Sequence, residues 1–239
     1  MGRHKTKQNA KRKSVLNEPY FNLQEITPIT FTQDKVWTAY ENDKNLFLHG
    51  LAGTGKTFIS CYLGMSEVLD PQNQYKNLTI VRSVVPTRDI GFLPGTEEQK
   101  TEVYEAPYKS IFTNIFQRGD AYEILRKKNA VNFLTTSYIR GITLEDTIII
   151  VDECQNLNFH ELDTIITRVG QDSKIFFCGD FMQTDLTKQN EKNGLHDFTR
   201  ILEEMDEFNL TEFTIGDIVR SGFVRSYLIQ KTKLGLGFE

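Results

Sequence analysis

The stretch Gly50-Leu-Ala-Gly-Thr-Gly55-Lys56-Thr57 decides the fold of this chain. It matches the pattern GxxxxGK[ST] in full, and it lies between the apolar run 45–49 and the helix-like segment 57–69. A strand before the loop and a helix after it are the context that a phosphate-binding loop requires. Glycines let backbone amides turn toward phosphate oxygens, and the following helix N-terminus adds free N–H groups and a partial positive charge. We therefore predict a nucleotide-phosphate site formed by Gly50, Leu51, Ala52, Gly53, Thr54, Gly55, Lys56 and Thr57, with Lys56 at the β- and γ-phosphates and the Thr57 hydroxyl on Mg²⁺.

Strand-like and helix-like segments alternate on both sides of this loop. Apolar, β-branched runs predict strands at 45–49, 78–83, 131–135, 147–151, 174–178 and 210–214. Such runs separated by helices indicate a mostly parallel sheet with helices on both faces, an α/β fold. One helix start is well marked, because Asn158 and Glu161 have the spacing of a capping box. The length of 239 residues fits one or two domains, and we favour a single one at about 150 residues per domain.

Two carboxylates follow the most apolar strand. Ile148-Ile-Ile-Val151 is succeeded by Asp152 and Glu153, so both acids are expected at the C-terminal edge of the sheet, where ligands bind in open α/β folds. There Asp152 is the candidate to hold Mg²⁺, and Glu153 is the candidate general base for an attacking water. Two adjacent acids at a strand end can also be mere surface charge, a reading that loses weight beside a phosphate loop. After the strand 174–178, Gln183 is the candidate amide near the γ-phosphate or the water.

Composition excludes several classes of protein. The chain is 39% hydrophobic and 25% charged, which are values of a globular protein. Its longest strongly apolar run is Ile148–Val151, too short to cross a bilayer. Three cysteines without a CxxC pair support neither a disulfide framework nor a zinc ribbon. No apolar segment follows the basic N-terminus, so no secretory signal is expected and the cytoplasm is the expected location.

The charge is unevenly distributed. The net charge is −4, yet the first thirteen residues carry six bases and no acid, so the remainder is near −10 (22 bases against 32 acids). We predict a basic, disordered arm over 1–20 followed by a nucleotide-binding domain over 21–239. A basic arm on an acidic body is typical of nucleic-acid-binding tails, and a merely solvated terminus is the other reading. The six bases are Arg3, Lys5, Lys7, Lys11, Arg12 and Lys13.

Several further segments, taken in order, resemble the PhoH-like ATPases, a family related to the RecA-like core of superfamily 1 helicases. The resemblance extends over about residues 22–235, and its most discriminating parts are Gly91-Phe-Leu-Pro-Gly95 and Arg140-Gly-Ile-Thr-Leu144. The other matching segments are Thr32-Gln33, the phosphate loop, Val81–Pro86, Val151–Asn156, Thr167–Gly170, Gly179–Leu186 and Asp217-Ile-Val-Arg220.

The resemblance implies a RecA-like ATPase that uses ATP and Mg²⁺, with Gln33 near the adenine and Arg220 as a possible arginine finger. Bases that follow predicted strands on the active edge are candidates for contacts to RNA or single-stranded DNA: Arg82, Arg88 and Arg140. The chain departs from the family at Ser83, Ile142 and Cys154, which bears on the nucleic-acid contacts rather than on the ATP site. A compact member such as this one looks like the bacteriophage-encoded forms, and no nuclease domain is expected.

One RecA-like domain leaves the γ-phosphate without an opposing surface unless a second subunit supplies it. We therefore expect a head-to-tail ring, a hexamer by preference, with Arg220 reaching the neighbour's site. Two other functions stay open: a nucleotide-gated assembly or regulatory module with little turnover, and a P-loop kinase. An aromatic stripe at four-residue spacing is expected to pack in the core rather than to stack on bases; it consists of Tyr104, Tyr108, Phe112 and Phe116.

Overall fold

The sheet of this protein has six strands. A computed structural model of the chain describes residues 22–83, 97–180 and 189–235. Its strands are hydrogen-bonded in the order β3-β2-β4-β5-β1-β6, and the sheet is parallel. The predicted α/β fold is thereby confirmed. The strands are β1 Asn45–Gly50, β2 Asn77–Arg82, β3 Val131–Thr135, β4 Thr147–Asp152, β5 Lys174–Gly179 and β6 Phe208–Phe213.

Seven α-helices lie within the described ranges. They are α2 Phe31–Glu41, α3 Lys56–Leu69, α4 Glu97–Phe116, α5 Ala121–Lys127, α6 Phe159–Ile166, α7 Gln189–Glu203 and α8 Gly222–Lys233. The chain forms two compact units. We call the one with residues 27–59, 151–167 and 175–235 the P-loop unit, and the one with 22–26, 60–150 and 168–174 the β2–β3 unit. None of the described helices is long and apolar enough to span a membrane.

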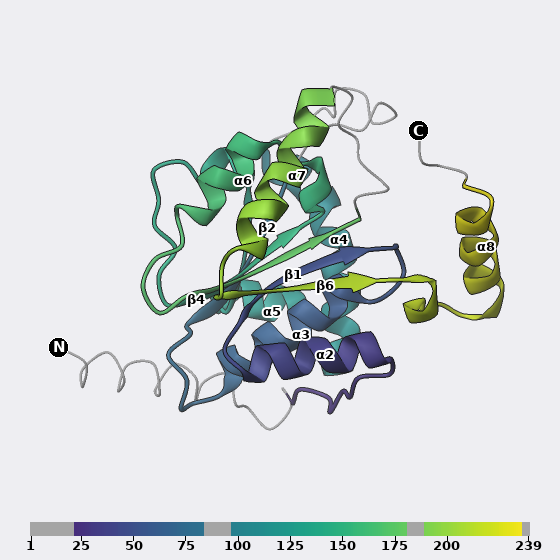
Figure 1. Ribbon diagram of the computed structural model, residues 1–239. Coiled ribbons are helices and arrows are strands. Elements are labelled where there is room, and N and C mark those ends of the chain that lie inside the picture. Colours follow the sequence, from purple (N-terminus) through teal and green to yellow (C-terminus); the bar gives the residue numbers. More distant parts are fainter. Residues whose placement is uncertain (1–21, 84–96, 181–188, 236–239) are drawn as a thin grey trace. The chain divides into compact units, whose positions relative to one another are not determined.

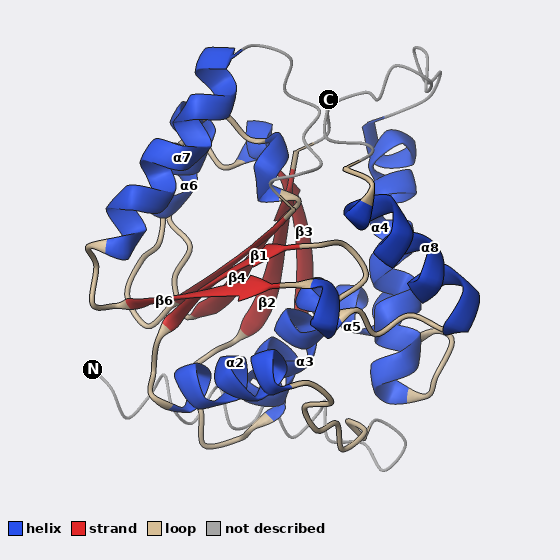
Figure 2. Cartoon of the chain, turned by 45° about the vertical axis from the view of Figure 1, so that its right-hand side comes forward, coloured by secondary structure: helices blue, strands red, loops and turns tan. Residues whose placement is uncertain are grey.

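Both faces of the strands in the P-loop unit are covered by helices. Strand β1 pairs with β5 on one side and β6 on the other, and successive side chains of a strand point to opposite faces. On β5, Phe176 meets the ring of Tyr40 in α2 at 5.9 Å, whereas Phe177 meets Phe198 in α7 at 5.2 Å. Helix α2 therefore packs on one face, and α7 with its neighbour α6 on the other (Figures 1 and 2).

The predicted capping box starts α6. The side chain of Asn158 accepts a hydrogen bond from the Glu161 amide (3.1 Å), and the Glu161 carboxylate accepts one from the Asn158 amide (3.0 Å). Two N–H groups at this helix end are thus satisfied by side chains rather than water. This sets the entry of the chain into α6 directly after the carboxylate pair.

The aromatic stripe packs inside the β2–β3 unit. Tyr108, Phe112 and Phe116 of α4 are buried. The Tyr108 ring lies 5.8 Å from that of Phe133 in β3, and Phe112 makes an edge-on contact with Tyr122 of α5 at 5.4 Å. The Tyr122 hydroxyl donates to Glu105 (2.6 Å), and burial, with this bond, raises its pKa. These three rings pack in the core, as expected from the sequence, whereas Tyr104 of the same stripe is half-buried beside Arg82.

Candidate nucleotide site

The phosphate loop connects β1 to α3 in a backbone conformation that only glycine adopts readily. Gly50, Gly53 and Gly55 have φ of 110°, 77° and 90°, in the region that disfavours residues with a Cβ. A Cβ at Gly50 would lie 2.1 Å from the Phe213 carbonyl oxygen of β6. Leu51 donates its amide to that same oxygen (3.1 Å). The loop glycines thus serve a close backbone approach at the end of β1 as well as the turn itself.

Lys56 folds back over the loop at the first turn of α3. Its Nζ donates to the carbonyl oxygens of Gly50 (2.7 Å) and Leu51 (2.8 Å), and the side chain is buried. Burial lowers the pKa of Lys56, against the opposing effect of nearby anions of which Asp180 is the strongest. A cation held inside a loop of this shape is what the polyphosphate of a nucleotide requires.

The two carboxylates lie at the C-terminal end of β4, where Asp152 is the last residue of the strand and Glu153 follows it. The Thr57 hydroxyl donates to Oδ1 of Asp152 at 2.7 Å, and Asp152 is buried. This places two oxygen ligands side by side, and Mg²⁺ in nucleotide sites takes one or two protein oxygens with phosphates and water. The residues therefore fit the metal that the sequence implies. In the part of the chain that the structure describes, no cluster of three or more His, Cys, Asp or Glu side chains could hold another metal.

Glu153 stands in a left-handed backbone conformation, with φ of 53° and ψ of 42°. Such a conformation costs a residue with a Cβ about 1–2 kcal/mol. Its carboxylate accepts a hydrogen bond of 2.6 Å from Nε2 of Gln155. Backbone strain of this kind concentrates at functional sites. The geometry thus singles out Glu153, rather than Asp152, as the acid that is held in an unusual orientation.

Gln155 is a site residue that sequence reasoning missed. It is buried, and while its Nε2 donates to Glu153, its Oε1 accepts from the Asp180 amide at 3.1 Å. It therefore ties the end of β4 to the residue after β5. Packing is tight here, since a Cβ at Gly179 would lie 2.6 Å from Sγ of Cys154. Burial raises the pKa of the Cys154 thiol, which keeps it neutral. The sequence signals for Gln155 were its place two residues after the acid pair and its position within the segment Val151–Asn156.

Gln33 lies against the phosphate loop, and its expected place near the adenine stays a prediction. It is buried at the start of α2, where its Nε2 donates to the Thr54 carbonyl (3.2 Å) and its Oε1 accepts from the Ile29 amide (2.9 Å). Thr30 is the N-cap of this helix, and its side chain accepts from the Gln33 amide. Both ends of the Gln33 amide are thus fixed, so its position relative to the loop is set by α2.

Arg220 lies over the phosphate loop of its own chain. The Val219 amide donates to the Gly53 carbonyl at 3.0 Å. A Cβ built on Gly53 would come within 3.0 Å of Cγ and 3.5 Å of Nε of Arg220. The stem of this arginine therefore crosses the loop within one chain. Its expected role at a neighbour's site stays a prediction.

The other predicted residues belong to the β2–β3 unit or lie outside the described residues, so their roles stay predictions. Arg82 and Arg140 belong to the β2–β3 unit. The guanidinium of Arg82 lies 5.9 Å from the Tyr104 ring centroid, and Arg140 is exposed. Gln183 and Arg88 lie outside the described residues, as do the basic arm and Gly91–Gly95.

Comparisons with known proteins point to one family. A family model described as PhoH-like protein matches residues 25–230. A PhoH-like protein of Synechocystis is 31% identical over 198 residues, which are 82% of this chain and 59% of that protein. Protein PhoH2 of Bacillus subtilis is 39% identical over 142 residues, 58% of this chain and 32% of that protein. The chain thus spans roughly a third to three fifths of the length of these relatives.

A solved structure shares the fold. The large terminase of a thermophilic bacteriophage, in complex with ADP, has a TM-score of 0.50 and 13% identity over 85% of this chain and 50% of that chain. At this identity the likeness concerns the fold alone. The family model, by contrast, includes Gln33, the whole phosphate loop, the Asp152–Glu153 pair and Arg220. Its match over most of the chain, with these residues gathered in one unit, establishes that the chain belongs to the family of PhoH-like proteins.

Proposed function

We propose that this chain is a Mg²⁺-dependent ATPase whose hydrolysis is coupled to single-stranded nucleic acid, with RNA favoured over DNA. The observation that carries the proposal is the geometry of the P-loop unit. A buried lysine in the loop, a threonine hydroxyl bonded to a buried aspartate, and a strained glutamate beside that aspartate lie together there. This set contains a cation to bind the phosphates, two ligands for the metal and a base for the water. These are the groups that the attack of water on a γ-phosphate needs.

Each residue has a distinct role in the proposed reaction. Lys56 binds the β- and γ-phosphates, and Thr57 and Asp152 hold Mg²⁺, which neutralises charge on the phosphates. Glu153 accepts the proton of the attacking water. Its bond from Gln155 orients the carboxylate, so Gln155 is a positioning residue. Gln183 is proposed to orient the water.

The position of Arg220 supports a role at the nucleotide of its own chain. Its stem already crosses Gly53, so its side chain lies at the phosphate loop of its own chain. Charge on the γ-phosphate in the transition state is stabilised by an arginine supplied either from the same chain or from a partner. The contact at Gly53 favours the first of these two arrangements.

Coupling to nucleic acid is supported by charge. The six bases of the arm stand against a body near −10, and phosphate backbones bind such segments regardless of sequence. Assembly into a head-to-tail ring is part of the proposal, because one RecA-like domain offers one side of a nucleotide site.

Steady-state ATP hydrolysis tests the proposal, measured with and without single-stranded RNA or DNA and with Glu153→Gln as the blank. We expect hydrolysis that requires Mg²⁺ and rises with one of the two polymers. Lys56→Ala should abolish both nucleotide binding and turnover. Hydrolysis without stimulation would point to a protein or small-molecule client. Tight ATP binding without hydrolysis would favour the assembly module, and phosphoryl transfer to a small molecule would favour the kinase.

A further inference from the structure

Helix α8 buries none of its residues. It has twelve residues, Gly222–Lys233, and it follows β6 through the short helix Ile215–Asp217, away from α2, α6 and α7 (Figure 1). Phe223 is 85% exposed and Tyr227 60% exposed, and these two residues are one helical turn apart. A helix of this length is marginal in water unless an apolar face is packed. Its exposed rings therefore require a covering surface.

The charged side chains in and around helix α8 are all positive. Residues 218–235 contain four bases and no acid: Arg220, Arg225, Lys231 and Lys233. The rest of the chain beyond the arm is strongly acidic, so a segment of this kind stands out. Its covering surface should be apolar at the centre and acidic at the rim.

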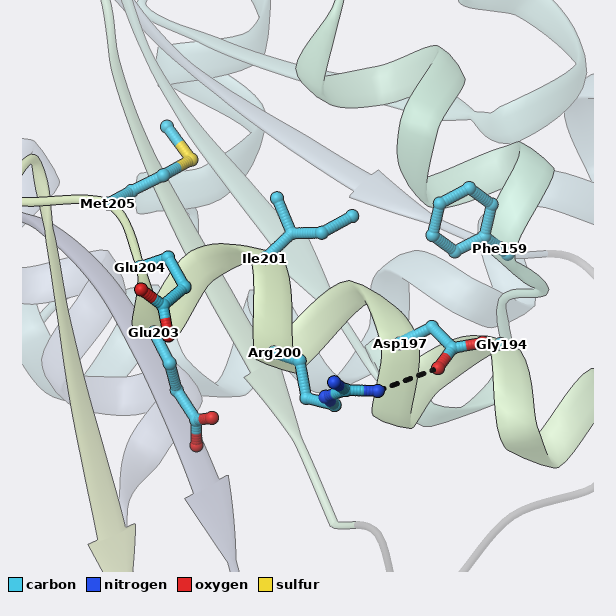
Figure 3. Close-up of a pocket in the computed structure, with 8 residues that line it drawn as sticks. All are labelled: Phe159, Gly194, Asp197, Arg200, Ile201, Glu203, Glu204 and Met205. Carbon is cyan, nitrogen blue, oxygen red and sulfur yellow. Dashed lines mark ion pairs between the residues drawn. The ribbon is translucent and has the colours of Figure 1, made fainter.

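The same unit carries a groove with those properties. It has a volume of about 820 Å³, shares no residue with the phosphate loop, and lies along α7 with Phe159 of α6 at one end (Figure 3). Phe159, Ile201 and Met205 give it apolar side chains, and Ile201 is 49% exposed. Gly194 lets the two helices approach, since a Cβ there would lie 2.9 Å from Cβ of Phe159.

Acidic residues surround the groove. Residues 197–207 contain five acids and one arginine. Arg200 is within 3.9 Å of Asp197 and so does not neutralise the rest. Glu203 and Glu204 line the groove, and both are exposed, as are Asp206 and Glu207 just beyond it.

We propose that α8 of one copy of this chain docks into the α6–α7 groove of a second copy. The apolar residues Phe223 and Tyr227 would meet Ile201 and Met205, and the bases of 218–235 would meet the acids of 197–207. The two surfaces share no residue, so the contact is heterologous and builds a ring if it closes. This inference specifies the surfaces of the ring in the proposed function and rests on that part of it.

The docked helix would also be connected to the nucleotide site. A Cβ at Gly53 would lie 3.2 Å from Cδ1 of Leu228 in α8 and 3.0 Å from Cγ of Arg220. The phosphate loop of one copy therefore touches the helix that the next copy binds. Nucleotide in the loop is expected to change the strength of assembly, with α8 as the connecting element.

Complementation of two surface variants tests the proposal by sedimentation velocity of the full chain. Phe223→Asp disrupts the apolar surface of α8, and Ile201→Asp disrupts the apolar surface of the groove. Each variant alone should associate roughly tenfold or more weakly than the wild type, because a buried anchor is removed. An equimolar mixture should form a one-to-one dimer and nothing larger, since only one intact helix and one intact groove remain to meet. Val103→Asp, a half-exposed apolar residue of α4 outside both surfaces, is the matched control and should assemble like the wild type.

Fluorescent ATP analogue binding by the variants separates this test from the proposed function. Variants that bind the nucleotide are folded, whether or not they hydrolyse it. Dimers in the mixture would support the pairing even if hydrolysis proved absent. A wild type that stays monomeric at all concentrations, variants that assemble normally, or a mixture without dimers would each overturn it. Loss of RNA binding in Phe223→Asp with assembly unchanged would overturn it too, and would assign the exposed rings to base stacking.

Discussion

The backbone conformation of Glu153 lowers the stability of the fold, so a functional role is the better explanation for it. Its left-handed backbone is unfavourable by about 1–2 kcal/mol for a residue with a Cβ, and nothing in strand formation requires it. The conformation turns the carboxylate toward Gln155 instead of continuing the direction of β4. Strain retained at this position is therefore consistent with selection for an oriented base.

Replacing Glu153 by Gly should leave the protein as stable or more stable while removing turnover. The relieved strain, about 1–2 kcal/mol, exceeds the entropy cost of ordering a glycine, about 0.5–1 kcal/mol, by roughly 0–1.5 kcal/mol. Glu153→Gln should keep nucleotide binding and lower kcat by about 10²–10⁴. Urea unfolding and steady-state hydrolysis measure the two effects.

Asp172 provides the matched control, because it is exposed and has the same φ of 53°. Asp172→Gly should change stability in the same direction without affecting hydrolysis. A clear loss of stability in Glu153→Gly, or normal turnover in either Glu153 variant, would contradict the assignment.

The sequence locates the candidate site residues whose positions depend on short spacing, and their chemical roles stay predictions. Lys56 and Thr57 follow from the loop pattern, and Asp152 from the end of an apolar strand. Gln155 did not follow, because one of its hydrogen bonds comes from an amide that is 25 residues away in sequence, that of Asp180. It also depends on the backbone turn at Glu153, which no local pattern specifies.

At the scale of elements, the turn after β6 connects α2 to the phosphate loop. The Asp217 carboxylate caps the short helix Ile215–Asp217 by accepting from the Thr214 amide (2.8 Å) and hydroxyl (3.0 Å). It also bonds Thr32 and Thr30 at the start of α2. Burial disfavours the charged form, yet these hydrogen bonds outweigh it, so the pKa of Asp217 is lowered.

Asp217→Ala should destabilise the protein by about 1 kcal/mol at neutral pH, the usual effect of losing such a cap. A lowered folded-state pKa means that the charged form stabilises the fold above the unfolded pKa of about 3.9. That contribution is lost as the pH falls through the lower folded value. Urea unfolding at several pH values should therefore show the two proteins converging in acid.

Asp217→Asn separates the charge from the hydrogen bonds. It keeps an acceptor oxygen, so it should lose less stability than the alanine variant at neutral pH. Equal stability of wild type and Asp217→Ala at neutral pH, or a difference between them that grows in acid, would contradict this account.

Strand positions were predicted to within two residues, because a buried parallel strand is a short apolar run bounded by polar residues. The largest difference is at β6, predicted at 210–214 and found at Phe208–Phe213. Among the described strands it pairs only with β1, and three of its six residues are at least partly exposed. The apolar run is therefore less complete there, and the pattern locates it less well.

The order of strands in the whole sheet could not be read from the chain. Sequence neighbours β1 and β2 are separated in the sheet by β4 and β5. That order depends on helix crossovers, and any of several orders satisfies the same apolar pattern.

The uneven distribution of charge, in contrast, is visible in the sequence and concerns the molecule as a whole. An acidic body repels nucleic acid unless basic segments offset it.

Deleting residues 1–13 should weaken binding to single-stranded RNA and reduce its dependence on salt. The net charge then changes from −4 to −10, and removing one phosphate contact lowers the slope of log K against log salt by about 0.7. ATP hydrolysis without RNA should be unchanged, because the phosphate loop and its partners lie in residues 27–59, 151–167 and 175–235. Binding titrations at several salt concentrations measure the slope. Substituting the six bases by glutamine in the full-length chain controls for length, and an unaltered slope in both proteins would place the nucleic-acid contacts in the folded body instead.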